Sequence, residues 1–180
     1  GADTPIAQLA ESADAINPKM IILSAQRLPT ARSLAEAANV LSASRHQVAY
    51  GGQVFTTDQN LISRIAGHYL GDDLEDSIPF IKHLALQTLP IKPPIEPSDE
   101  HKLLLAEYDE HRGLIEHQVL HVMRDNGKEF AALHEVNQFF GEGIAASLAL
   151  DNMRYLDKEI EWVRNLNIAA DVFGDIYPFY

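Results

Sequence analysis

The sequence contains no cysteine, and this absence excludes disulfides and thiolate metal sites. It also contains no apolar run near the roughly 20 residues that a membrane-spanning helix requires. Residues 1–5 carry neither a basic region nor an apolar core of the kind found in signal peptides. These absences predict a cytoplasmic protein that does not enter a membrane.

Positive charge is also scarce, since 14 Lys and Arg stand against 26 Asp and Glu and give a formal net charge of −12. The deficit is concentrated in the second half. Residues 1–88 hold six basic and nine acidic residues, whereas residues 89–180 hold eight and 17. Neither half offers the basic surface that binding to a phosphate backbone needs, so we expect no direct contact with nucleic acid.

Helical and extended patterns alternate through residues 1–88. Short apolar runs that end in small or polar residues predict strands at 20–23, 47–50 and 68–70. Amphipathic spacing and capping residues predict helices over 5–16, 30–43, 58–65 and 72–87, and Pro79 should kink or split the last of them. Such alternation is typical of βαβ units and predicts an α/β domain with a parallel sheet. The strand at 20–23 should then be buried on both faces.

The composition changes at residues 89–98, which contain four prolines and predict an extended, semi-rigid linker. Beyond this segment, helical spacing predicts helices over 98–123, 129–150 and 153–166, and a weaker one over 168–180. Residues 99–180 are therefore expected to form an all-α helical bundle.

Small residues stand where the first two predicted strands end: Ser24 after the first, and Gly51 and Gly52 after the second. Ligands of open α/β sheets bind outside the carboxyl ends of the strands. A glycine pair lets a backbone approach a ligand closely, and it also simply makes a turn. Spacing alone leaves both interpretations open.

The spacing Ser24-x-Gln26, followed by Gly51-Gly52, resembles the second part of the signature of cobalamin-binding domains. That signature runs Asp-x-His-x-x-Gly, then Ser-x-Leu, then Gly-Gly. Residues 21–25, 50–55 and 67–74 are especially similar to cobalamin-binding domains of the MerR-associated and light-responsive regulatory type. The resemblance covers residues 1–88 and implies a partial Rossmann-like, flavodoxin-like sheet.

The resemblance also implies a ligand, cobalamin or a related tetrapyrrole. In the family, the histidine is the lower axial cobalt ligand, and the serine and glycines line the slot for the dimethylbenzimidazole nucleotide tail. The cofactor-binding residues implied here are Ser24, Ala25, Gln26, Gly51, Gly52, Val54, Phe55, Leu70 and Gly71. No catalytic residue and no metal ligand are predicted.

Two departures from the family pattern stand out. Gln26 occupies the position of the family's leucine, and this change could disturb the tail slot. The histidine motif should lie some forty residues before Ser24, which is upstream of Gly1. The comparison therefore implies that the family's first strand, first helix and second strand are missing from this sequence, which is either a fragment or a divergent protein with a reorganised sheet.

The second half resembles, more loosely, the helical bundle that accompanies such domains in bacterial regulators, and residues 144–150 and 156–162 carry the likeness. In the photoreceptor branch, a bundle tryptophan is followed ten and eleven residues later by Glu-His, which covers the upper cobalt face. After Trp162 those positions hold Val172 and Phe173, so adenosylcobalamin photochemistry is not implied. Trp162 is predicted to be a core residue.

His117 and His121 are four residues apart and share a helix face, a spacing that could hold a metal. Without a third ligand, the pair predicts a solvated or interface face. Nearby, Glu107, Asp109, Glu110 and Glu116 are interpreted as a solvated helix face.

Together these patterns suggest a non-enzymatic sensory or regulatory module that binds a corrinoid and relays the signal through domain packing. One alternative is a ligand-free protein–protein interaction module that kept the fold and lost the cofactor. Another is the corrinoid-carrying component of a methyltransferase. An incomplete sheet would expose strand edges, so a protein partner or self-association is also expected.

Overall fold

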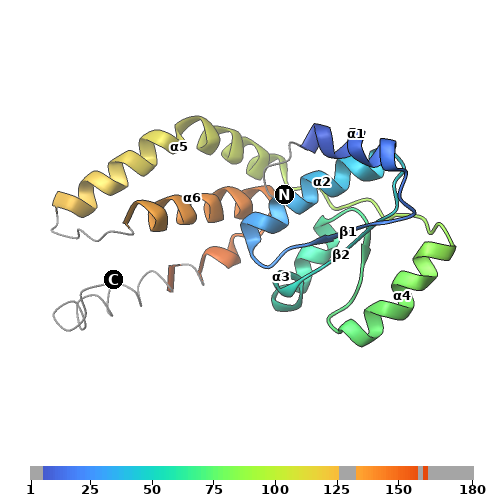
Figure 1. Ribbon diagram of the computed structural model, residues 1–180. Coiled ribbons are helices and arrows are strands. Elements are labelled where there is room, and N and C mark those ends of the chain that lie inside the picture. The colour runs from blue at the N-terminus through green and yellow to red at the C-terminus, as the bar shows by residue number, and fades with distance from the viewer. Residues whose placement is uncertain (1–5, 126–132, 158–159, 162–180) are drawn as a thin grey trace, which may run out of the picture. The chain divides into compact units, whose positions relative to one another are not determined.

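The computed structural model describes residues 6–125, 133–157 and 160–161. The chain divides into two compact units, residues 1–98 and residues 99–180 (Figure 1). The first unit contains strands and helices. The described part of the second contains helices and turns.

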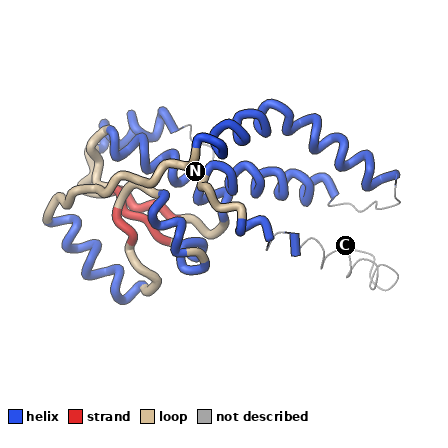
Figure 2. The backbone as a smooth tube through the Cα atoms, turned by 180° about the vertical axis from the view of Figure 1, so that it is seen from behind, coloured by secondary structure: helices blue, strands red, loops and turns tan. Residues whose placement is uncertain are grey.

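The first unit follows the predicted alternation of helix and strand. Its elements are α1 (Ile6–Ile16), β1 (Ile21–Ser24), α2 (Leu28–Ala43), β2 (Val48–Gly51), α3 (Gln53–Thr57), the 3-10 helix η1 (Gln59–Arg64), β3 (His68–Tyr69) and α4 (Leu74–Leu86). The strands form one parallel sheet in the order β1-β2-β3 (Figure 2). The mixed α/β class and the parallel sheet are therefore confirmed. A sheet of three strands is compatible with a Rossmann-like fold but does not establish one.

The central strand β2 is the buried one. Val48 and Ala49 are fully buried and Tyr50 is 1% exposed, because β2 has a neighbour on each side. By contrast, β1 pairs only with β2, and Ile22 is 51% exposed. The prediction that the first strand is buried on both faces is wrong for this reason: β1 is an edge strand.

Helices cover both faces of this small sheet. Successive residues of a strand point to opposite faces. Tyr69 of β3 meets the ring of Phe55 in α3, whereas His68 meets the ring of Phe80 in α4. Hence α3 and α4 lie on opposite faces.

The helices depart from the predictions in where they begin, in their type and in their continuity at proline. α2 begins at Leu28 because Thr30 Oγ1 donates to the carbonyl of Arg27 (2.7 Å) and accepts from its N–H (3.1 Å), which closes the first turn early. The predicted helix over 58–65 is the 3-10 helix η1 instead, with Asp58 accepting a hydrogen bond from the N–H of Asn60. α4 is not split at Pro79 and continues to Leu86.

The proline-rich segment 89–98, expected to be a linker, belongs to the first unit. The N–H of Ile95 donates to the carbonyl of Ser63 (2.8 Å). Arg64 Nη1 donates to the carbonyls of Ile95 and Glu96. Gln47 Nε2 donates to the carbonyl of Leu89 (3.0 Å). These bonds hold the segment against η1 and the start of β2, so it is part of the domain surface.

In the second unit, α5 (Asp99–Asp125) packs against α6 (Leu133–Ala149). Tyr108 donates its hydroxyl hydrogen to the carbonyl of Gly141, and Asn137 Nδ2 donates to the carbonyl of Glu116. Of the predicted helix over 153–166, residues 154–157 and 160–161 are helical and Met153 lies in a turn. Residues 158–159 and 162–166, which include Trp162, lie outside the described residues, as does the segment 168–180. No helix in the described ranges is long and apolar enough to cross a membrane.

Candidate functional site

The carboxyl ends of the three strands meet at one edge of the sheet, here called the strand-end edge and made of residues 24–26, 51–53 and 69–72. Ser24 pairs in register with Gly51, and the N–H of Ala25 donates to the Gly51 carbonyl (3.1 Å). The N–H of Leu70 donates to the carbonyl of Tyr50 (2.9 Å). These contacts join residues that lie 20 to 27 positions apart in the sequence.

Gly52 is required by the fold itself. Its backbone has φ +121° and ψ 163°, a region that only glycine adopts readily. A Cβ at this position would lie 2.1 Å from the carbonyl oxygen of Ala25. The chain leaving β2 therefore passes directly over the end of β1. This contact explains the glycine without a ligand.

The other two glycines at this edge differ from Gly52. A Cβ on Gly51 would lie 3.9 Å from Leu70 Cβ, an ordinary contact, so this position has room for a methyl group. Gly71 has φ +91°, and no atom stands within 4 Å of its would-be Cβ. The positive φ therefore explains why residue 71 is a glycine, and the space beside its Cα is open.

Gln26 bridges two strand ends. Its Nε2 donates to the hydroxyl of Ser24 (3.3 Å), and its Oε1 accepts from the N–H of Gln53 at the start of α3 (3.4 Å). Both Ser24 and Gln26 are exposed. The amide thus occupies the position where the resembling family has leucine, and it ties β1 to α3 with polar contacts.

Three predicted site residues lie in the core instead of at the surface. Ala25, Val54 and Phe55 are 1%, 4% and 0% exposed. The ring of Phe55 lies 5.0 Å from that of Tyr50 and 6.0 Å from that of Tyr69, centroid to centroid. The side chains of Ala25, Val54 and Phe55 are therefore turned into the core, where a ligand at the surface of the strand-end edge would not touch them.

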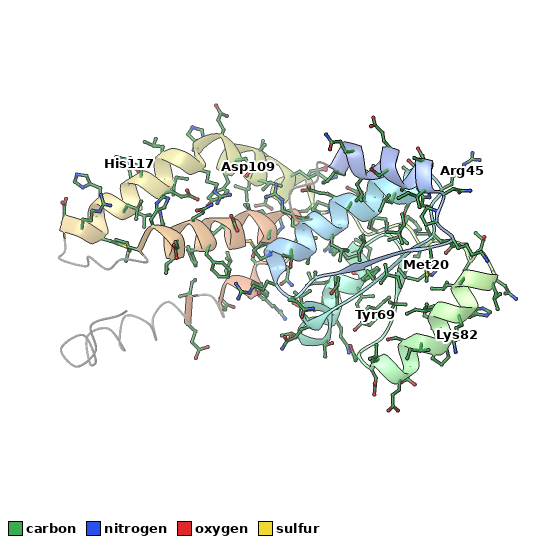
Figure 3. All side chains as sticks on the ribbon, in the orientation of Figure 1. Met20, Arg45, Tyr69, Lys82, Asp109 and His117 are labelled. Carbon is green, nitrogen blue, oxygen red and sulfur yellow. The ribbon has the colours of Figure 1, made fainter. Side chains whose placement is uncertain are left out.

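Sequence reasoning missed the two tyrosines of this cluster. Tyr50 donates its hydroxyl hydrogen to the carbonyl of Ile62 (2.9 Å), and burial, followed by the proximity of Tyr69, raises its pKa. Tyr69 donates to the carboxylate of Asp72; burial first, and then this bond, raises the pKa of Tyr69. Figure 3 shows Tyr69 among the side chains around the sheet. Tyr69 and Asp72 stand three residues apart, and that spacing is the only signal in the sequence that could have suggested their contact.

His117 and His121 of α5 are both exposed. His121 Nδ1 lies 2.9 Å from Asp125 Oδ2 on the exposed surface, and His117 projects from the same helix (Figure 3). Within the described ranges, no group of three or more His, Asp or Glu side chains is placed to hold a metal ion.

A second polar feature lies between α5 and α6. Arg112 Nε donates to Glu116 Oε1 (2.6 Å), and Arg112 Nη2 donates to the carbonyl of Gln138 (3.3 Å). These residues help to line an open groove of about 540 Å³. Glu107, Asp109 and Glu110 are exposed, in line with the solvated face that the sequence suggested, whereas Glu116 is partly buried beside Arg112.

In comparisons with known proteins, no protein-family model matches the chain, and no curated protein matches it.

Proposed function

We propose that this chain is a cytoplasmic, non-enzymatic regulatory module whose α/β unit binds a corrinoid or a related tetrapyrrole at the strand-end edge. Ligand binding would change the packing of the α/β unit with the helical unit, and that change would carry the signal. One observation carries the proposal. The parallel register sets Ser24 beside Gly51 at the carboxyl end of the sheet, the position where open α/β sheets bind ligands.

The chemistry of the edge suits the nucleotide tail of a corrinoid. Ser24 and Gln26 present an exposed hydroxyl and an exposed amide, which can donate and accept hydrogen bonds. Gly51 and Gly71 add backbone without side chains, so a flat group can approach closely. Ser24, Gln26, Gly51 and Gly71 are therefore the residues that would hold the tail. The corrin itself would supply the regulatory signal through the state of its cobalt.

The ligand-free interaction module is the second candidate, and two observations favour it. Gln26 already satisfies the hydroxyl of Ser24 and the N–H of Gln53, and Gly52 is explained by its contact with Ala25. In this alternative the strand-end edge is complete without a cofactor. A corrinoid carrier in methyl transfer would share the binding step and differ by moving a methyl group.

The test is a titration of the full chain with cobalamin and with cobinamide, which has the same ring without the nucleotide tail, followed by absorption spectroscopy and thermal unfolding. We expect cobalamin to shift its spectrum and raise the unfolding temperature, and cobinamide to bind at least about tenfold more weakly, which corresponds to about 1.4 kcal/mol. Ser24→Leu, which fills the edge, should weaken cobalamin by a similar factor. Lys19→Ala is the matched control, because Lys19 is exposed just before the opposite end of β1.

Two results would count against the proposal in different ways. If cobalamin changes neither its spectrum nor the unfolding temperature, ligand binding fails and the interaction module remains. If cobalamin and cobinamide bind equally well, the chain binds corrinoids but not through the tail at the strand-end edge.

A further inference from the structure

Burial repeats every third residue along the proline-rich segment that follows α4. Three of its residues are half-buried at this spacing: Ile91, Pro94 and Pro97. The residues between them are exposed. A polyproline II helix has three residues per turn, so residues three apart share one edge of it, whereas a β-strand would alternate every second residue. The period of three therefore indicates a polyproline II helix that turns one edge toward the first unit.

Hydrogen bonds fix both ends of this helix, here called the proline strap (residues 89–97). Gln47 Nε2 donates to the carbonyl of Leu89 at one end, and at the other the N–H of Ile95 donates to the carbonyl of Ser63 and Arg64 donates to that of Ile95. Each proline between these anchors also has its φ fixed by its ring. A partner that binds the strap would therefore have little conformational freedom to remove, and preorganisation of this kind favours affinity.

The outward side of the strap carries prolines that do not hold it in place. Pro90 and Pro93 are both exposed and stand three residues apart, so they share one edge of the helix. Domains that recognise the Pro-x-x-Pro spacing dock such an edge into a groove lined with aromatic side chains. We propose that the proline strap is a docking site for a protein domain with a groove of this kind.

The rest of the strap suits the same class of partner. Lys92 and Ile95 share the next outward edge, and the side chain of Ile95 is 53% exposed, which adds an apolar group beside the two prolines. Pro90, Pro93 and Pro94 have no N–H, so the middle of the strap offers mainly carbonyl oxygens. These oxygens can accept hydrogen bonds from the tryptophan N–H and tyrosine O–H groups of an aromatic groove.

The test is an NMR titration with the full chain of two isotope-labelled probes, an SH3 domain and a WW domain that each bind plain Pro-x-x-Pro peptides. We expect signals of the aromatic groove of at least one probe to shift and to saturate, and a proline-rich peptide to reverse the shift. Pro93→Ala removes an outward proline. It should raise the dissociation constant at least about tenfold, because a few anchoring side chains carry most of the binding energy of an interface.

Pro94→Ala is the matched control. Both substitutions release the φ angle of one residue of the strap and loosen the unfolded chain to a similar degree, but Pro94 is half-buried on the inward edge. Pro94→Ala should therefore lower the unfolding temperature more than Pro93→Ala does, and weaken binding less.

The absence of any shift in both probes would overturn the proposal. Shifts that lie outside the aromatic groove would do the same, as would an equal loss of affinity in the two variants. Corrinoid binding is measured separately and does not involve the strap, so a failure of either proposal leaves the other standing.

Discussion

Substitution of Gly52 by alanine tests whether this glycine is held by the fold. The new Cβ would lie 2.1 Å from the carbonyl oxygen of Ala25 and 2.8 Å from its carbonyl carbon. Both atoms belong to the backbone, so no side-chain rotation relieves the contact. The backbone angles of Gly52 add a second cost, since residues held in this glycine-only region lose about 1–3 kcal/mol.

The end of β1 must therefore move by roughly 1 Å, well beyond what close packing tolerates. The hydrogen bond from Ala25 to Gly51 would lengthen with it, at a further cost of about 1 kcal/mol. We expect Gly52→Ala to lower the free energy of unfolding of the first unit by about 2–4 kcal/mol, the sum of these contributions. That loss is a large fraction of the 5–15 kcal/mol typical of a domain.

Gly51→Ala is the matched control, because its Cβ would make an ordinary 3.9 Å contact with Leu70 Cβ and its φ is not positive. We expect this variant to change the free energy of unfolding by less than about 1 kcal/mol, toward higher stability, as alanine restricts the unfolded chain. The assay is hydrogen exchange in increasing urea, read on peptides that cover β1, so that the two units are followed separately. If Gly52→Ala proved no less stable than Gly51→Ala, the close passage of β2 over β1 would be refuted.

Two further predictions concern packing and pH. Tyr50→Phe should cost about 1–2 kcal/mol because it leaves the partly buried carbonyl of Ile62 without its donor, as urea unfolding would show. Folding raises the pKa of Tyr50 above its ordinary value of 10.0, so wild-type stability should be fully present below pH 10 and fall as the pH rises further, and Tyr50→Phe should lessen that fall. On α5, Gly113→Ala meets no atom within 4 Å and should raise the unfolding temperature, since alanine favours a helix by about 1 kcal/mol. On α6, Gly141→Ala should raise the unfolding temperature less, because its Cβ would lie 2.3 Å from Glu116 Oε1 and displace that carboxylate. An equal rise in the unfolding temperature for both variants would argue against this contact.

The strands could be predicted from sequence because each is a short apolar run that ends in turn-forming residues. The order of the strands in the sheet could not be predicted, and this order decides which strand is buried. The same apolar pattern gives a fully buried Val48 in the central strand and a half-exposed Ile22 in the edge strand. The helix α3 was missed because five residues are too few to show a helical period. Asp58, predicted to begin an α-helix, caps a 3-10 turn instead.

The meeting of Ser24 with Gly51 could be predicted, since parallel strands bring their carboxyl ends to one edge. The reason why residue 52 must be a glycine could not be predicted, because it depends on a contact with Ala25, which is 27 positions away in the sequence. Spacing also gives no sign that Phe55 is buried. Resemblance to a binding motif therefore identified the edge, and packing decided which of its residues a ligand could reach.

The parallel register also constrains the order in which the first unit folds. Ile21 pairs with Val48 across 27 positions, and Ala49 pairs with His68 across 19, so neither pairing forms until a long loop has closed. α2 fills most of the first loop, and helices form within about 1 μs, which shortens the distance that the ends must search. We therefore expect the folding nucleus to consist of α2 with β1 and β2, and the two-residue strand β3 to dock afterwards. Chains that have formed only this nucleus expose both edges of a two-stranded sheet, and this intermediate is the stage at which the first unit is most prone to aggregate.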